Sequence, residues 1–159
     1  MRALAGVSVP ARGRVLVGTV PAVRARSRVA FLPGVGGLDP AWSLSRAVRV
    51  VNGLVSTGGA RVGVTRLVET AESLGVRTRV PVGRLPWAER ARAGLALTLA
   101  REATLFVLDD PFRGATDVAL AQRVAGALED AGARGALVVS SGLPGWRADA
   151  PLLDLGGRA

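Results

Sequence analysis

The sequence predicts an α/β fold with a parallel sheet, and three observations support this prediction. Short apolar runs alternate with longer segments whose apolar residues recur at helical spacing. The run at residues 105–108 is apolar throughout, which is typical of a strand buried on both faces of a parallel sheet. A chain of 159 residues with 49% apolar residues is long enough to form its own core. We therefore expect a single domain over residues 1–159.

The amino-terminal half is expected to contain two short strands and two helices. Residues 1–6 read as the end of a helix, which Gly6 terminates. Ser43 is a candidate N-cap for the first complete helix, and Gly75 is a candidate terminator for the second. The expected elements are strands at 14–17 and 28–32, a glycine-rich loop at 34–40, helices at 46–55 and 64–74, and an extended connector at 76–84.

The carboxy-terminal half repeats the alternation of helix and strand. A helix over residues 87–102 leads directly into the apolar strand at 105–108. Residues 118–131 form the next expected helix, and Gly132 is predicted to end it. Strands are expected at 135–139 and 152–155.

Two adjacent acids, Asp109 and Asp110, follow the apolar strand and make the strongest candidate site. Open α/β sheets bind ligands at the carboxyl ends of their strands, where these side chains emerge. One carboxylate there can hold Mg²⁺ against phosphates, and a second can act on water. A turn or helix cap is the alternative explanation, and the position of the acids favours a site.

The composition excludes several other kinds of site. The sequence has no Lys, His or Cys, so it offers no zinc ligands of the usual kind, no histidine base, no thiol nucleophile and no phosphate-loop lysine. The net charge of +9 draws attention to polyanionic partners, but the arginines are scattered and only 3 Trp and 3 Phe could stack on bases. Nucleic acid is therefore not expected as a partner. No apolar stretch reaches the ~20 residues of a membrane span, so we expect a cytoplasmic protein, attached to the inner face of the cell membrane at most through a partner.

Several motifs occur in the order typical of one protein family. Residues 85–92 resemble the pattern L-S-G-G-E/Q-R-x-R, with matches at Leu85, Glu89, Arg90 and Arg92. Pro86, Trp87 and Ala88 stand in place of the serine and both glycines. The run L-F-V-L-D-D-P at residues 105–111 resembles a Walker B strand. Residues 31–34 resemble a Q-loop with Gly34 at the glutamine, and residues 138–141 resemble a switch strand with Ser141 at the histidine. In this series the chain resembles the ATPase domain of the ATP-binding cassette (ABC) family.

The resemblance implies a parallel sheet of the P-loop NTPase type that lacks its P-loop strand, with a small helical subdomain at about residues 41–85. ATP and Mg²⁺ are the implied cofactors. Asp109 would bind Mg²⁺ and Asp110 would take the place of the catalytic glutamate. Glu89, Arg90 and Arg92 would order the signature helix at a dimer interface next to nucleotide, and Gly34 and Ser141 would lie at nucleotide-sensing positions.

The function implied by the resemblance is that of an ATP-binding subunit, coupled to a membrane-spanning permease and paired with a second ABC ATPase subunit. The departures from the family motifs predict that this chain does not hydrolyse ATP by itself. Pro86 and Trp87 hinder approach of the backbone to phosphate, and Asp110 is one methylene shorter than glutamate. Two alternatives remain open: a non-catalytic pseudo-ATPase that regulates an intact subunit, and a basic binding protein without nucleotide.

Overall fold

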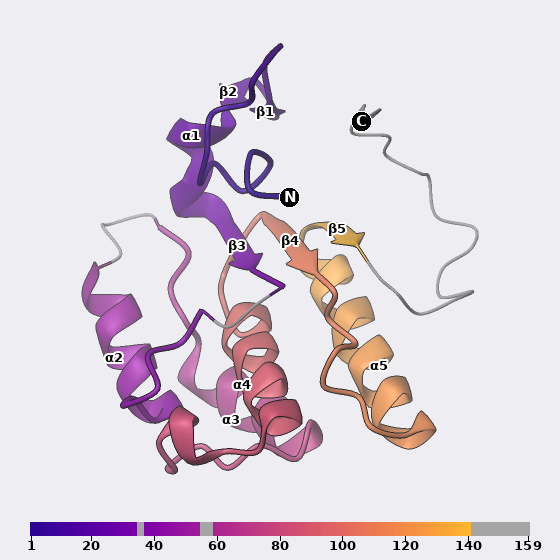
Figure 1. Cartoon of the computed structure of the whole chain (residues 1–159). Coiled ribbons are helices and arrows are strands. Elements are labelled where there is room, and N and C mark those ends of the chain that lie inside the picture. The colour runs from indigo at the N-terminus through magenta and orange to yellow at the C-terminus, as the bar shows by residue number, and fades with distance from the viewer. Residues whose placement is uncertain (35–36, 55–58, 141–159) are drawn as a thin grey trace.

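A three-stranded parallel sheet lies at the centre of the molecule (Figure 1). The structure is a computed structural model, and it describes residues 1–34, 37–54 and 59–140. The sheet consists of β3 (Val29–Leu32), β4 (Leu105–Asp109) and β5 (Ala136–Ser140), with β4 in the middle. Both strand pairs are parallel, with Leu32 opposite Leu108 and Asp109 opposite Ser140. The predicted α/β fold with a parallel sheet is therefore confirmed.

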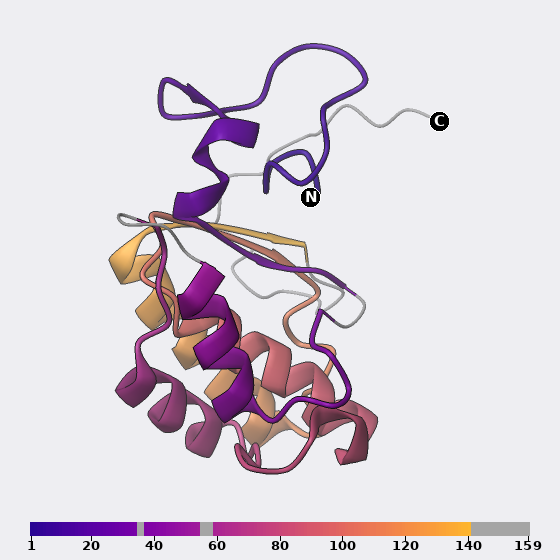
Figure 2. The ribbon, with the colours of Figure 1, turned by 90° about the vertical axis from the view of Figure 1, so that its left-hand side faces the viewer.

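Four helices lie on one side of this sheet (Figure 2). They are α2 (Leu44–Leu54), α3 (Val64–Ser73), α4 (Trp87–Leu99) and α5 (Val118–Arg134). The central helix α4 is buried along most of its second half, whereas the other helices bury one stripe each. All four helices contribute buried apolar residues to one hydrophobic cluster. The segment 41–85, expected to be a helical subdomain, contains α2, α3 and the 3-10 helix η2 (Val82–Arg84). Leu44, Leu67 and Leu85 of this segment belong to the same core.

Alternation along the strands decides which residues face the helices. Ala30, Leu32, Phe106 and Leu108 belong to the helical core, whereas Val107 lies on the opposite face of the sheet. That opposite face is covered by the amino-terminal segment, from which Ala5 is buried and Met1, Leu4 and Val17 are partly buried. β4 is consequently buried on both faces, as the uniformly apolar run predicted.

The amino-terminal segment packs on this second face and extends away from it (Figures 1 and 2). It contains a two-stranded antiparallel hairpin, β1 (Leu16–Val17) and β2 (Val20–Pro21), followed by α1 (Ala22–Ala25) and the 3-10 helix η1 (Arg26–Arg28). The expected strand at 14–17 is therefore shorter than predicted. Residues 1–6 form one helical turn, and Gly6, at φ 70°, closes it in the left-handed conformation that terminates helices.

Two of the predicted helix boundaries are confirmed by hydrogen bonds. The Ser43 Oγ accepts a bond from the Arg46 amide at 3.3 Å at the start of α2. Gly75 lies just beyond α3 with φ 64°, and the next amide, of Val76, donates back to the Ala71 carbonyl at 2.8 Å. Both are local signals, which explains why the sequence alone predicts them.

Two other boundaries were predicted wrongly, for tertiary reasons. The helix expected at 87–102 ends at Leu99, because Arg101 forms a β-bridge with Val62 and the Glu102 amide donates to the Arg61 carbonyl. α5 continues past Gly132 to Arg134 and ends at Gly135. A Cβ on Gly135 would lie within 3.0 Å of the carbonyl oxygens of Ala103 and Thr104, so only glycine fits there. The strand expected at 152–155 lies outside the described residues.

Candidate functional site

The paired acids lie at the carboxyl end of the central strand, as expected from their position in the sequence. Asp109 is the last residue of β4, and its Oδ1 accepts a 2.5 Å hydrogen bond from the Ser140 hydroxyl at the end of β5. The Asp110 amide donates to the Ser140 carbonyl at 2.8 Å. Asp110 adopts a φ of 50°, a left-handed conformation that aspartate tolerates better than most residues. The two neighbouring strand ends thus hold both acids in a tight turn.

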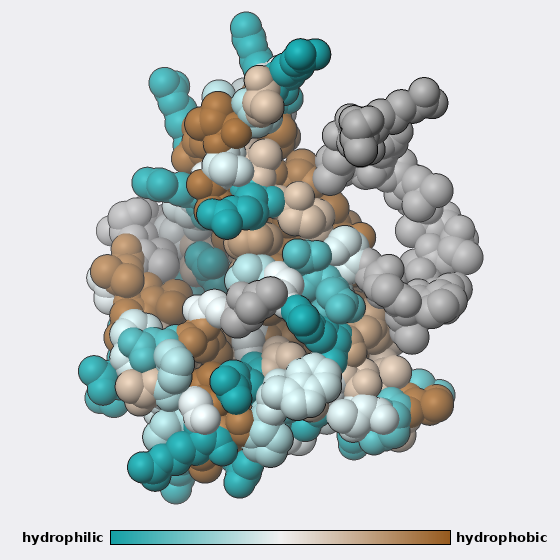
Figure 3. All heavy atoms as spheres, viewed as in Figure 1, coloured by the Kyte–Doolittle hydropathy of each residue, from teal (hydrophilic) through white to brown (hydrophobic). Residues whose placement is uncertain are grey.

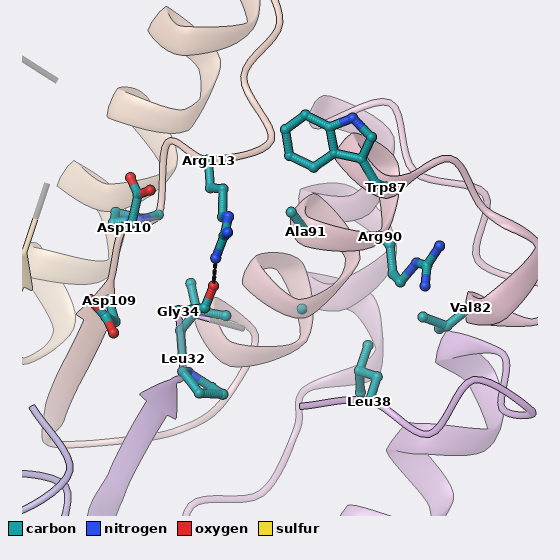
Figure 4. A pocket seen from close by; sticks show the side chains of 13 residues that line it. Leu32, Gly34, Leu38, Val82, Trp87, Arg90, Ala91, Asp109, Asp110 and Arg113 are labelled. Carbon is teal, nitrogen blue, oxygen red and sulfur yellow. Dashed lines mark hydrogen bonds between the residues drawn. The ribbon is translucent and has the colours of Figure 1, made fainter. Parts of the chain in front are cut away.

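Gly34 brings the end of β3 directly against Asp109. A Cβ on Gly34 would lie 2.7 Å from Asp109 Oδ2, so the absence of a side chain is what permits the approach. The Gly34 carbonyl accepts a hydrogen bond from the Arg113 guanidinium, drawn as a dashed line in Figure 4. Arg113 follows the acids on the same loop, so it connects the ends of β3 and β4 across the site.

A pocket of about 290 Å³ opens between these strand ends and the start of α4 (Figure 4). Asp109, Asp110 and Arg113 lie on the strand side, and Trp87 and Ala91 lie on the helix side. The remaining lining residues are Leu32, Pro33, Gly34, Leu38, Val82, Arg90, Gly94 and Pro111. The pocket therefore has mainly apolar walls with two carboxylates and two guanidinium groups, the usual character of a small-molecule site.

The signature-like residues of α4 do not all face this pocket. Arg90 lines it, but Figure 4 shows its side chain directed toward Val82 rather than toward the acids. Arg92 donates to the Leu74 carbonyl at 2.8 Å and to the Gly114 carbonyl at 2.6 Å. It therefore joins α4 to the end of α3 and to the loop after β4. The predicted contact of these residues with nucleotide at a dimer interface stays a prediction.

Glu89 does not line the pocket and is instead held by Arg77. Its carboxylate accepts three bonds from this residue, from the backbone amide at 2.9 Å, from Nε at 3.0 Å and from Nη2 at 2.9 Å. The Glu89 side chain is only 9% exposed, whereas that of Arg77 is 59% exposed. Hydrogen bonding to Arg77 lowers the pKa of Glu89 below its ordinary value, although burial acts in the opposite direction.

The Glu89–Arg77 pair predicts acid sensitivity. Because the folded-state pKa of Glu89 is lowered, its stabilising contribution is present above the unfolded value of 4.5 and is lost as the pH falls through the lower folded-state pKa. We expect the difference in unfolding free energy between the parent protein and Glu89→Gln to shrink as the pH falls below this value. Urea unfolding across a pH series measures it, with Glu72→Gln, an exposed carboxyl on α3, as the control. A constant difference at all pH values would contradict the prediction.

The acidic turn supplies only some of the ligands that a divalent cation needs. Asp109 Oδ2 has no hydrogen bond to any described residue, which leaves it available to a metal ion. Among the described residues, no group of three or more acidic, His or Cys side chains could hold a metal by itself. Mg²⁺ commonly binds through one or two carboxylates, with phosphate oxygens and water as the other ligands. Asp109 and Asp110 therefore fit Mg²⁺ that arrives with a phosphorylated ligand.

Two residues of the candidate site were not predicted from the sequence, and one predicted residue lies outside the described part of the chain. Arg113 and Ser140, which contact Gly34 and Asp109, were not among the site residues expected from the sequence, although Arg113 follows the acids in a D-loop-like stretch and Ser140 lies in the strand that resembles the switch strand. Arg113 lies close to the acids in the sequence, which was a hint to its role, whereas Ser140 is distant from them in the sequence. Ser141, expected at the switch position, lies outside the described residues.

No known protein-family profile matches the sequence, and no curated protein sequence matches it. Solved structures do match the fold. A structure described as an ABC-transporter ATP-binding protein from Pyrococcus furiosus superposes with a TM-score of 0.72 at 24% identity, over 91% of this chain and 72% of that one. The ATP-binding subunit of an ABC transporter gives 0.69 at 15% identity, over 88% and 60%. A dimeric ATP-binding cassette in a post-hydrolysis state, bound to ADP and Pi, gives 0.72 at 15% identity, over 89% and 67%.

The chain has the fold of an ABC ATPase domain. This agrees with the resemblance seen in the motif order. The chain spans 60% to 72% of the lengths of these three structures. No helix in the described part of the chain is long and apolar enough to cross a membrane. Within the ABC ATPase fold, the pocket between β4 and α4 is the place where the sequence and the structure bring candidate site residues together.

Proposed function

We propose that this chain is the ATP-binding part of an ABC-type transporter and that its pocket binds a magnesium–nucleotide complex. The supporting observation is the arrangement of Asp109 and Asp110 at the end of β4, against Gly34 and beside a pocket that also contains Arg113. Asp109 would hold Mg²⁺ together with the nucleotide phosphates, and Asp110 would position water. An arginine in the same pocket supplies donors with the geometry to bind phosphate.

The same proposal includes weak or absent hydrolysis by this chain alone. The sequence has no lysine to hold phosphates in a phosphate loop. Pro86 offers no N–H, and Trp87 places a bulky side chain at the mouth of the pocket. The permease and the second ATPase subunit remain proposed partners, and attachment to the inner face of the cell membrane would follow from the permease.

Magnesium-dependent thermal stabilisation by nucleotide tests the proposal. Ligand at 100 times its dissociation constant stabilises the folded state by about 2.7 kcal/mol. We expect a rise in Tm with Mg²⁺–ATP or Mg²⁺–ADP, and we expect Asp109→Asn to remove the part of the rise that requires Mg²⁺. The control is Asp130→Asn, which removes the same charge at an exposed position of α5. A melting curve unaffected by nucleotide in the parent protein would refute the proposal and favour a binding protein without nucleotide.

Gly34→Ala tests the approach of β3 to the acids. Its methyl group would meet Asp109 Oδ2 at 2.7 Å and displace a carboxylate that the Ser140 hydroxyl otherwise holds in place. Changes in groups that orient a metal ligand typically weaken metal binding by about 10- to 100-fold. We therefore expect weaker Mg²⁺–nucleotide binding by isothermal titration, with little change in Tm without ligand. Unchanged binding would mean that Asp109 is not the metal ligand.

A pseudo-ATPase that pairs with an intact subunit is the second candidate, and Trp87 favours it. This side chain is 63% exposed at the first residue of α4, which is unusual for so large an aromatic group. Trp residues of this kind frequently anchor protein interfaces. Co-purification with an intact ABC ATPase subunit that Trp87→Ala abolishes would support this candidate, whereas ATP hydrolysis by the chain alone would contradict it.

A further inference from the structure

The end of α2 carries the only asparagine of the chain, Asn52, and the residue after it is Gly53. Leu44, Val48 and Asn52 are spaced four residues apart, so they lie on one stripe of the helix, and Leu44 and Val48 are buried. The outer surface of the α2 region, at the left of Figure 3, shows hydrophilic and hydrophobic side chains next to one another. Asn52 is thus a polar residue on the inward stripe, where a side-chain amide needs hydrogen-bond partners within the protein.

The backbone of Val62 supplies both partners. The Asn52 Nδ2 donates to the Val62 carbonyl at 3.0 Å, and the Val62 amide donates to the Asn52 Oδ1 at 2.7 Å. Val62 is only 3% exposed, and it forms the β-bridge with Arg101 just beyond α4. We call these two hydrogen bonds the Asn52 clasp. The clasp ties the end of α2 to a segment that is itself joined to the end of α4.

An Asn–Gly pair can lose its side-chain amide without any reactant except water. The Gly53 nitrogen gives up its proton and attacks the Asn52 Cγ, and the side-chain nitrogen leaves as ammonia. Water then opens the cyclic imide to aspartate or isoaspartate. Glycine favours the attack because it has no Cβ to crowd it. In the folded protein, Gly53 lies within α2, where N–H groups beyond the first turn are bonded inside the helix, and the clasp holds the Asn52 side chain.

We propose that Asn52 is a deamidation site that the clasp protects, and that its deamidation releases the end of α2 irreversibly. The reaction requires this end of the helix to open, because both reacting groups are otherwise occupied. Its product has a carboxylate oxygen where Nδ2 was, and this oxygen faces the Val62 carbonyl without a proton to donate. Isoaspartate also adds a methylene to the helix backbone. This inference goes beyond the proposed function and does not require nucleotide.

Peptide mapping by mass spectrometry tests the site, after incubation of the full chain at mildly alkaline pH with and without concentrated urea. We expect conversion of Asn52 in urea and conversion at least about 10-fold slower in the native protein, since a buried hydrogen bond of this kind shifts an opening equilibrium by about that factor. Gly53→Ala should slow the conversion in urea, and a Cβ there meets no atom of the described chain within 4 Å. No conversion in urea, or equal rates in both conditions, would overturn the inference.

A variant next to the clasp tests local opening. Val62→Ala removes buried methyl groups from the clasped segment and leaves the Asn–Gly pair intact, so it should speed native conversion several-fold without changing the rate in urea. The matched control is Val107→Ala, at an equally buried position on the other face of the sheet, which should speed native conversion less. Equal acceleration by the two variants would show that Asn52 reacts through global unfolding, and the clasp would then not be the protecting contact.

Asn52→Asp reproduces the aspartate product and tests its effect on the fold. We expect urea unfolding at neutral pH to show a folding equilibrium constant about 10-fold lower than that of the parent, because the Val62 carbonyl loses its donor. Gln122→Glu makes the same amide-to-acid change at an exposed position of α5 and should leave the constant unchanged. Unchanged stability of Asn52→Asp would contradict release of the helix end. None of these outcomes depends on whether the pocket binds nucleotide.

Discussion

Replacement of Phe106 by alanine should produce the largest loss of stability of any single change in this protein. Phe106 lies in the middle of the central strand and is fully buried among the helices. The Arg134 guanidinium packs over its ring at 5.2 Å from the centroid, so the ring supports both the core and the end of α5. Removal of a buried phenylalanine typically costs about 3–5 kcal/mol, a large part of the about 5–15 kcal/mol by which small domains are stable.

Urea unfolding of Phe106→Ala measures this loss, and Phe31→Ala supplies the matched control. Phe31 lies on the neighbouring strand β3, but it faces the other side of the sheet and is only partly buried. We therefore expect a clearly smaller loss for Phe31→Ala, because less apolar surface returns to water. Equal losses for the two variants would mean that the two faces of the sheet are equally well covered, contrary to the structure.

The second large effect is expected from Gly114→Ala. Gly114 is buried on the loop after the acids, and a Cβ there would lie 2.5 Å from the Ala88 carbonyl oxygen and 2.7 Å from the Arg92 Cγ. The first of these atoms belongs to the backbone of α4 and cannot move alone. The loop would have to shift away from α4, which would strain or break the 2.6 Å hydrogen bond from Arg92 to the Gly114 carbonyl. Overpacking of this kind typically costs about 1–3 kcal/mol.

Gly126→Ala is the control for Gly114→Ala and should have the opposite sign. Gly126 lies within α5, is exposed, and has no atom within 4 Å of its hypothetical Cβ. Alanine in a helix interior is favoured over glycine by about 0.5–1 kcal/mol, so this variant should be slightly more stable. Thermal melts of the two variants compare them directly. A neutral result for Gly114→Ala would show that the loop after β4 is free to move away from α4.

In this lysine-free chain, several arginine side chains connect neighbouring elements through hydrogen bonds to backbone carbonyls. Arg92 binds the carbonyls of Leu74 and Gly114, and Arg101 binds the Ala60 carbonyl at 3.1 Å. Arg134 donates to the Leu99 carbonyl at the end of α4. Burial lowers the pKa of Arg101 and of Arg134. The fork of donors lets Arg92 and Arg134 satisfy carbonyls that helix ends leave unpaired, whereas Arg101 satisfies a loop carbonyl. Arg92 was predicted to serve nucleotide binding through the signature motif, and its observed contacts are within the fold.

The sequence alone determined the features that depend on local chemistry. The apolar run before Asp109 predicted a buried parallel strand, Ser43 and Gly75 marked the limits of two helices, and the order of the motifs pointed to the ABC ATPase fold. The strand and cap signals each lie within a few residues, and the resemblance is carried by the order of short motifs along the chain, so no knowledge of distant contacts was needed. The position of Asp109 and Asp110 at a strand end was predictable for the same reason.

Only the tertiary structure decided which residues surround those acids and where the interrupted helices end. Gly34 and Asp109 are 75 residues apart, and their contact exists because β3 and β4 pair in parallel with their carboxyl ends together. The end of α4 at Leu99 depends on the pairing of Arg101 with Val62, and Glu89 is occupied by Arg77 from a preceding loop. Such contacts are set by the packing of elements distant in the chain, which local propensity and spacing do not encode.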